Sequence, residues 1–297
     1  MVKDCSKIIL LGHSGFIGSH LLEYFQQRHV HVPVLGFSSS EMDLTDFDAV
    51  TTLAPHLDED AILIHCSAIQ KWVHDDLAVF EKNILMVSNV LRLLQERQIR
   101  HLIYLSSAAV YGERVTNLNI VEETVPAPSN YYGVAKLACE QAAALLAEQQ
   151  PGLALTILRP SLVYGNRNAD EYYLPPGFIR RALDGECIRI WGDGEEIRDF
   201  IHIRDVCAVM DLVAERKIVG TYNLCSGGAV SYREILSQIG TQLGRAVNVE
   251  ERARTRPKVS MALRNTKILA AAGPHRFISM SDAIRELITA ATNTEPR

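Results

Sequence analysis

The stretch Ile8-Ile9-Leu10-Leu11-Gly12-His13-Ser14-Gly15-Phe16-Ile17-Gly18 decides the fold of this chain. Its first four residues form an apolar run that is typical of a buried parallel strand. Gly12 permits a tight turn, Gly15 lets backbone N–H groups approach a pyrophosphate, and Gly18 lets the following helix pack closely on the strand. Since the glycines lie between a predicted strand and a predicted helix, they indicate a dinucleotide-binding loop. Its expected contact residues are Gly12, Ser14, Gly15, Phe16, Ile17 and Gly18.

Strand and helix signals alternate along the first 165 residues, which predicts a doubly wound parallel sheet of the α/β class. From about residue 166, prolines and glycines interrupt the pattern and indicate a smaller mixed α/β substrate lobe. We expect a dinucleotide-binding domain over 1–165, completed by about 199–226, and a lobe built from 166–198 and 227–297. The predicted strands are 8–11, 30–36, 61–65, 102–105, 153–158 and 221–224, and the predicted helices after the first are 46–57, 79–97, 132–149 and 204–214.

The bulk composition excludes several classes of protein. Of the 297 residues, 47% are hydrophobic and 22% are charged, which is enough to bury a large core. A formal net charge of −5 gives no sign of a nucleic-acid surface. No apolar run approaches the ~20 residues of a membrane span, no signal peptide precedes the first strand, and the scattered cysteines lack metal-ligand spacing. These features predict a cytoplasmic protein without a metal, membrane or nucleic-acid partner.

The end of the second predicted strand bears on the choice of cofactor. Dinucleotide folds usually place an acid there to bind the adenosine ribose, but here the strand ends in Phe37-Ser38-Ser39. Serine hydroxyls can donate hydrogen bonds to a 2′-phosphate, whereas a carboxylate would repel it. NADP(H) is therefore favoured, and NAD(H) is the alternative. Asp43-Leu44 either meets the adenine or begins the helix near Asp46. The remaining expected cofactor contacts are Cys66, Ser67, Ala68 and Pro160, together with Tyr132 and Lys136.

A tyrosine and a lysine four residues apart form the strongest candidate for catalysis. Tyr132 and Lys136 lie on one face of the predicted helix 132–149. A nearby positive charge lowers the high pKa of a phenol, so that it can exchange a proton with an alcohol or ketone. Ser107 follows a predicted strand at the edge where α/β sheets bind ligands. A Tyr-x-x-x-Lys pair alone is often an unreactive surface feature, but the glycine loop and the strand-end serine favour a catalytic trio.

With these motifs in place, the sequence resembles the extended short-chain dehydrogenases, the NAD-dependent epimerase/dehydratase group. Several independent motifs in order are far more specific than any one of them, and the resemblance runs nearly end to end. The matching segments are 12–18, 105–112, 122–124, 128, 132–136, 158–160, 163–165, 192–194, 198–206, 222–224 and 256–257.

The resemblance implies roles for the matching residues. Ser107, Tyr132 and Lys136 match the catalytic trio, and Ala108 lies beside the substrate. Arg198 and Arg256 match arginines that clamp the diphosphate of a nucleotide sugar, a task that suits the planar guanidinium.

Each of these assignments has a structural alternative. The alternative for Arg198 is an ion pair with Asp199 or Asp205, and the alternative for Arg256 is a solvated surface position. His202 matches a packing position, and His65 and Cys66 are expected beside the cofactor without reacting.

Two departures from the family pattern limit the reactions that we expect. Ala108-Ala109 stands where sugar dehydratases carry acids, so dehydration is not expected, and Ser161-Leu162 replaces an asparagine that contacts substrate. The missing ribose acid and the short link 38–46 favour a reductase of a nucleotide-linked 4-keto-6-deoxyhexose. A nucleotide-sugar 4-epimerase is the alternative, followed by a non-catalytic NAD(P)-binding protein or an enzyme of another ketone. Family analogy also implies a homodimer through the helices that begin near Val79 and Tyr132.

Overall fold

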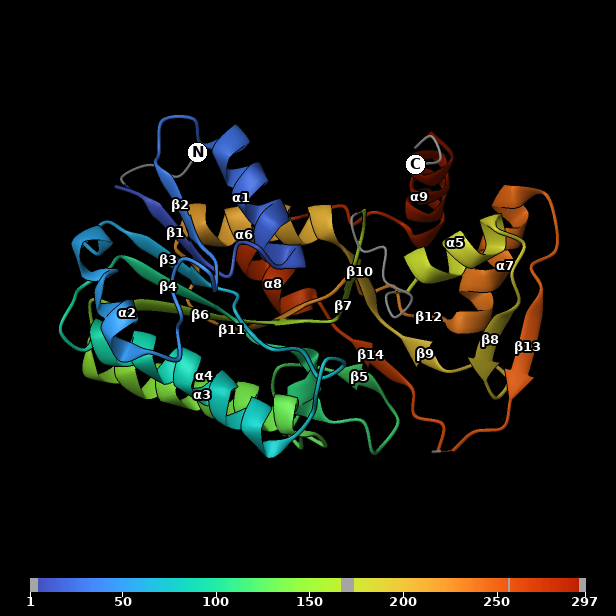
Figure 1. Ribbon diagram of the computed structural model, residues 1–297, viewed down its shortest axis with the longest axis horizontal. Helices are drawn as coiled ribbons and strands as arrows, with labels where there is room; N and C mark the ends of the chain where they lie inside the picture. Colours follow the sequence, from blue (N-terminus) through green and yellow to red (C-terminus); the bar gives the residue numbers. More distant parts are fainter. Residues whose placement is uncertain (1–4, 167–173, 256, 294–297) are drawn as a thin grey trace.

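A six-stranded parallel sheet forms the centre of the protein, as Figure 1 shows. The computed structural model describes residues 5–166, 174–255 and 257–293. The strand order is β11-β6-β4-β3-β1-β2, and every neighbouring pair is parallel. The predicted doubly wound α/β class is therefore confirmed. The strands are β1 (Ile8–Leu11), β2 (Val34–Phe37), β3 (Ile62–His65), β4 (His101–Leu105), β6 (Ala154–Pro160) and β11 (Gly220–Leu224).

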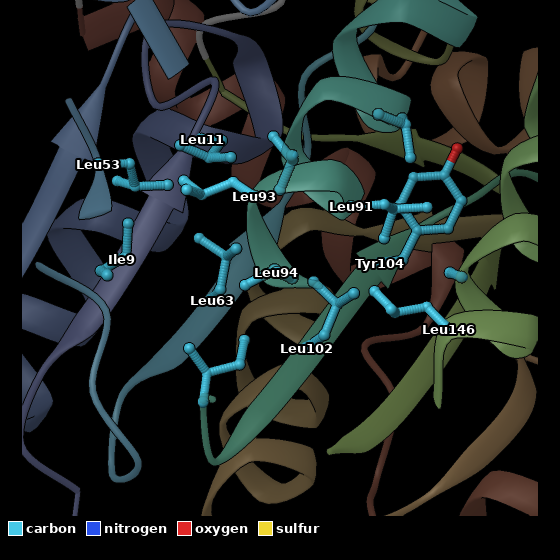
Figure 2. Packing of buried hydrophobic residues seen from close by; sticks show 14 of the residues in the cluster. Ile9, Leu11, Leu53, Leu63, Leu91, Leu93, Leu94, Leu102, Tyr104 and Leu146 are labelled. Atoms are coloured by element: carbon cyan, nitrogen blue, oxygen red, sulfur yellow. The ribbon is translucent and has the colours of Figure 1, made fainter. Parts of the chain in front are cut away.

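Alternate residues of each strand pack into two different helical layers, because successive side chains point to opposite faces of a sheet. In β1, Ile8 and Leu10 pack on the side of α1 (Phe16–Arg28), α6 (Ile203–Arg216) and α8 (Thr266–Ala272). Ile9 and Leu11 pack on the side of α2 (Phe47–Thr51), α3 (Leu77–Leu94) and α4 (Tyr131–Gln149). Figure 2 shows this second layer, in which strand side chains meet leucines of α3 and α4. Both faces of the sheet are thus covered, and its strand ends are left for ligands.

Two predicted elements differ from the structure. The second strand begins at Val34 and not at residue 30, and Val30 is 71% exposed, so this end of the apolar run lies outside the core. The predicted helix 46–57 is only the short α2, capped by Asp46, followed by the 3-10 turn η1 (Ala54–His56). Pro55 lies in that turn and cannot donate the backbone N–H that a continuous helix needs. The link 38–46 contains no helix, as expected.

The remaining elements lie to the right of the sheet in Figure 1. A separate apolar core joins α5 (Pro176–Leu183), β8 (Ile188–Trp191), α7 (Tyr232–Leu243), β13 (Val249–Arg252) and α9 (Met280–Asn293). Helix α8 packs instead with α6 and β11, although its residues fall in the predicted lobe segment 227–297. The domain boundaries themselves stay a prediction.

Short strand pairs join the two halves of the molecule. They are β5 (Asn117–Ile120) with β14 (Met261–Leu263), β7 (Leu162–Tyr164) with β10 (Phe200–His202), and β9 (Ile197–Arg198) with β12 (Val230–Ser231). The 3-10 turn η2 (Ala108–Tyr111) leads from β4 towards β5. Within the described residues, no helix combines the length and apolar character needed to cross a bilayer.

Candidate active site

Two contacts in the glycine loop are so close that they leave no room for a Cβ atom. Gly12 has a φ of 89°, and a Cβ on it would lie 2.6 Å from the Ser67 Oγ. A Cβ on Gly18 would lie 2.1 Å from the Gly12 carbonyl oxygen, closer than any side chain allows. The N-cap of α1 is Gly15, whose N–H donates to the Gly12 carbonyl at 3.1 Å. Glycine is therefore required where α1 begins against β1, and the N-terminus of that helix is placed to receive a phosphate.

The expected cofactor contacts gather at the carboxyl edge of the sheet. The loop 12–18 follows β1, Phe37-Ser38 ends β2, residues 66–68 follow β3, and Pro160 ends β6. Asp43 is exposed and accepts hydrogen bonds from the N–H and hydroxyl of Thr45, whereas Leu44 is buried. Asp43 thus forms a turn before α2 and does not cap that helix. Its contact with adenine stays a prediction.

A carboxylate that the sequence analysis missed lies at the end of β2. The N–H and hydroxyl of Ser38 donate to Oε2 of Glu41 at 2.8 and 2.6 Å. Nε2 of His13, in the glycine loop, lies 2.9 Å from the same oxygen. The hydrogen bonds from Ser38, and then that from His13, lower the pKa of Glu41 to about 2, so the group is charged at neutral pH. The sequence did carry a signal for this contact. Glu41 comes three residues after Ser38, a spacing at which a turn brings the carboxylate back to the serine.

Ser107 and Tyr132 come to the same edge because η2 packs on the first turn of α4. Ser107 precedes η2, and its hydroxyl accepts the N–H of Ala109 at 3.1 Å. Asn130 caps α4 by accepting the N–H of Gly133 at 2.7 Å. A Cβ on Gly133 would lie 2.6 Å from the Ala109 carbonyl oxygen, so η2 and α4 are nearly in backbone contact. The backbone N–H of Tyr132 also donates to Asp75 at 3.0 Å, which ties the loop after β3 to this helix.

Lys136 lies one turn further along α4, with its ammonium buried beneath the site. Its Nζ donates to the Leu105 carbonyl at 2.7 Å and lies 5.8 Å from the centre of the Tyr132 ring. Burial lowers the pKa of Lys136 to about 8. The side chain lines a small hollow together with Ser67 and Ala68, so predicted cofactor and catalytic residues meet there.

A buried polar network, also missed by the sequence analysis, supports the serine segment. The Ser106 hydroxyl donates to Glu140, one turn after Lys136 on α4. Arg159 donates to the other oxygen of Glu140 at 2.7 Å and to the Tyr111 hydroxyl at 3.0 Å. A buried ion pair holds its geometry only when its remaining hydrogen bonds are made, as they are here. The network joins β4, η2, α4 and β6 next to Ser107.

Two buried groups near the site have shifted pKa values. Burial lowers the pKa of His65 to about 4 and raises that of the Cys66 thiol to about 12. Both are therefore neutral at pH 7, and the expectation that neither reacts stays a prediction. His202 accepts the N–H of Arg204 and so caps α6, which confirms that it is a structural residue.

The structure overturns the structural alternative for Arg198 and leaves its proposed contact with a diphosphate a prediction. Arg198 pairs with Glu196, whereas Asp199 accepts hydrogen bonds from Ser161, Ser226 and Gly227. Asp205 contacts His275, so neither expected acid is the partner of Arg198. Arg256 lies outside the described residues. Among the residues that are described, no cluster of His, Cys, Asp or Glu could hold a metal ion.

Comparisons with known proteins agree with this architecture. A family model described as the NAD dependent epimerase/dehydratase family matches residues 8–225. The GDP-6-deoxy-D-mannose reductase of Pseudomonas aeruginosa is 28% identical over 77% of this chain and 78% of its own length. Two solved structures share the fold at 23% identity. They are RMD from Pseudomonas aeruginosa with NADPH (TM-score 0.81, 95% of this chain, 98% of that one) and the Thermus thermophilus UDP-glucose 4-epimerase with NAD (TM-score 0.84, 97% and 100%).

The chain therefore belongs to the NAD-dependent epimerase/dehydratase family. The family-level resemblance drawn from its motifs is confirmed.

The buried Lys136 predicts a pH dependence of stability. Since its pKa falls from 10.5 to about 8 on folding, the unfolded chain binds more protons between these pH values, and stability rises with pH there. In urea titrations, the stability of the wild type relative to Lys136→Met should rise by up to about 3 kcal/mol from pH 7 to pH 10. A difference that stays constant over this range would contradict the burial of a charged amine in the free protein.

Proposed function

We propose that the protein reduces the 4-keto group of a nucleotide-linked 6-deoxyhexose, with a nicotinamide dinucleotide as the hydride donor. The observation that carries this proposal is the position of Lys136, which is buried near the Tyr132 ring, donates to the strand that leads to Ser107, and lines a hollow with Ser67 and Ala68. A strand-edge hydroxyl, a phenol and an ammonium fit carbonyl reduction, because the oxygen that accepts charge needs a proton donor and a second hydrogen bond.

The chain's own groups divide the work of the reaction. When bound, the cofactor supplies the hydride that goes to C4 of the sugar. Tyr132 gives its phenolic proton to the C4 oxygen, which becomes the C4 hydroxyl of the product. Ser107 donates a hydrogen bond to the same oxygen and holds the carbonyl in place. The positive charge of Lys136 stabilises the phenolate that remains on Tyr132 until solvent reprotonates it.

The substrate class rests on the relatives and on two alanines. A relative is a GDP-6-deoxy-D-mannose reductase, and Ala108-Ala109 cannot transfer the protons that dehydration requires. A 4-epimerase is the second candidate, because a UDP-glucose 4-epimerase of Halalkalibacterium halodurans is 27% identical over 82% of both chains. Net oxidation of the reduced cofactor by a 4-keto sugar supports the reductase, whereas interconversion of two sugars without net oxidation supports the epimerase.

Tyr132→Phe tests the proton donor directly. We expect turnover to fall by about 100-fold or more, the usual contribution of a general acid, while cofactor binding by fluorescence stays nearly unchanged. Tyr131→Phe is the matched control, because its side chain neighbours Tyr132 on α4 but is 45% exposed. Full activity in Tyr132→Phe would remove the phenol from the mechanism.

Glu41 changes the choice of cofactor that the serines at the end of β2 indicated. Its charged carboxylate lies where the adenosine ribose is bound in this fold, and it would repel a 2′-phosphate. NADP(H) would have to displace Glu41 from Ser38 and His13, whereas a ribose hydroxyl of NAD(H) could donate to the carboxylate. We therefore propose NAD(H) as the preferred cofactor, in place of the NADP(H) expected from the sequence.

Glu41→Gln should move this preference towards the phosphorylated cofactor. Because one charge–charge repulsion near a surface is worth ~1–2 kcal/mol, we expect kcat/KM for NADPH relative to NADH to rise by about tenfold. Glu59→Gln, at an exposed position away from the site, should leave the ratio unchanged. A wild-type protein that uses NADPH as well as NADH would contradict the role of Glu41.

The outer faces of α3 and α4 support a homodimer. The two helices lie side by side in Figure 1 and expose Leu77, Leu85, Val134 and Leu145 by 54, 44, 40 and 57%. Apolar side chains exposed on two neighbouring helices fit a protein–protein contact. Light scattering should show a dimer that Leu145→Glu dissociates, whereas Val219→Glu, an equally exposed site elsewhere, should not. A wild-type monomer at micromolar concentration would refute the dimer.

A further inference from the structure

Two consecutive aspartates bond the first turns of two neighbouring helices, α3 and α4 (Figure 1). Asp76 is the N-cap of α3, and its carboxylate accepts the N–H of Val79 at 2.9 Å. Asp75, the residue before it, accepts the backbone N–H of Tyr132 in α4, with 3.0 Å between the nitrogen and Oδ1. A carboxylate is favourable at the N-terminus of a helix, where backbone N–H groups have no partner within the helix. One short segment of chain therefore supplies an acceptor to both helices.

This segment begins at the expected cofactor contacts. Residues 66–76 connect the end of β3 to α3. The buried side chain of Asn83 accepts the N–H of Ile69 at 2.8 Å and donates to the carbonyl of the same residue at 3.0 Å. Lys71 pairs with Glu113, which follows η2, at 2.8 Å. The segment is thus held at several points between the cofactor edge of the sheet and the helix that carries the proposed proton donor.

Within the chain, apolar packing does little to hold the first turn of α4. Tyr131 and Val134 are 45 and 40% exposed, and the residues that α4 contributes to the core layer of Figure 2 begin about two turns later, at Cys139. Polar contacts therefore decide where this turn lies. Asn130 closes the turn within its own segment, whereas Asp75 joins it to a different segment.

We propose that Asp75 is a positioning residue, which sets the place of the Tyr132 phenol relative to the bound cofactor. Its carboxylate fastens the second residue of α4 to the segment that leads away from the expected cofactor contacts. One continuous piece of chain then holds both reacting partners, and they keep their relative position. The catalytic consequence rests on the proposed function, whereas the contact itself belongs to the free protein.

Removal of the carboxylate should slow the chemical step without weakening binding. A misplacement of about 1 Å can cost about 100-fold in rate, so for a smaller displacement we expect Asp75→Ala to lower kcat by about tenfold. The KM for the sugar and the Kd for the cofactor should stay nearly unchanged, because the carboxylate is bonded to α4. Asp75→Asn keeps an oxygen acceptor in the same place and should recover most of the wild-type kcat.

Asp76 provides a matched control at the next position of the chain. Asp76→Ala removes an acceptor from the first turn of α3, as Asp75→Ala does from that of α4, so both variants should lower the melting temperature to a similar extent. Only Asp75→Ala should lower kcat, because only Asp75 bonds the helix that carries Tyr132. An equal loss of kcat in the two variants would indicate a general loss of structure and would overturn the positioning role.

A measurement without sugar follows the Tyr132 ring itself. In protein labelled with 3-fluorotyrosine, the fluorine NMR signal of Tyr132 is identified by its loss in Tyr132→Phe. With NAD⁺ bound, and well below the melting temperature, we expect Asp75→Asn and Asp76→Ala to give the wild-type signal. Asp75→Ala should give a shifted and broadened signal, because the first turn of α4 no longer has a fixed place against residues 66–76.

The two readouts separate the positioning role from the reaction. The role is overturned if Asp75→Ala keeps either the wild-type Tyr132 signal or the wild-type kcat. A protein that is inactive on every nucleotide sugar, but whose Tyr132 signal changes in Asp75→Ala, would overturn the proposed reaction and leave the position of the ring dependent on Asp75.

Discussion

The approach of Gly18 to the Gly12 carbonyl is the contact on which the rest of the site depends. With a Cβ only 2.1 Å from that oxygen, any other residue would push α1 away from β1. The contact sets where α1 begins and directs its N-terminus to the edge of the sheet. Gly12 in turn lies against Ser67 after β3, so the ends of neighbouring strands form one surface. A dinucleotide can span that surface only while these backbones remain in contact.

Buried charged groups support the proposed catalytic residues at the same edge of the sheet. Lys136 is buried under Tyr104 and Tyr132, and the loss of hydration lowers its pKa while bringing its charge near the phenol. The pair of Glu140 and Arg159 is also buried, and it anchors Ser106 next to Ser107. Breaking such a pair leaves an uncompensated charge in the core, which costs about 3–5 kcal/mol. The serine segment is thus held in place by a buried ion pair.

A charged carboxylate lies at the end of β2, beside the proposed cofactor site. Glu41 accepts hydrogen bonds from the N–H and hydroxyl of Ser38 and lies close to His13 of the glycine loop. A ribose hydroxyl can donate to such a carboxylate, whereas a 2′-phosphate meets its negative charge. Under the proposed assignment, Glu41 therefore sets the choice of cofactor, and the proposed catalytic trio does not need it for its chemistry.

The sequence by itself determined the parallel sheet and the glycine loop, because these depend on local periodicity and on short motifs, and it predicted the catalytic trio from the same kind of motif. It placed Asp46 as a helix cap and His202 as a structural residue, but it extended α2 through Pro55 and began β2 too early. The hydrogen-bond partners of Glu41 and Glu140 were decided by the tertiary structure alone. Their partners lie in other segments or across a turn, and a side chain's hydrogen bonds follow from distance in space, which residue order does not encode.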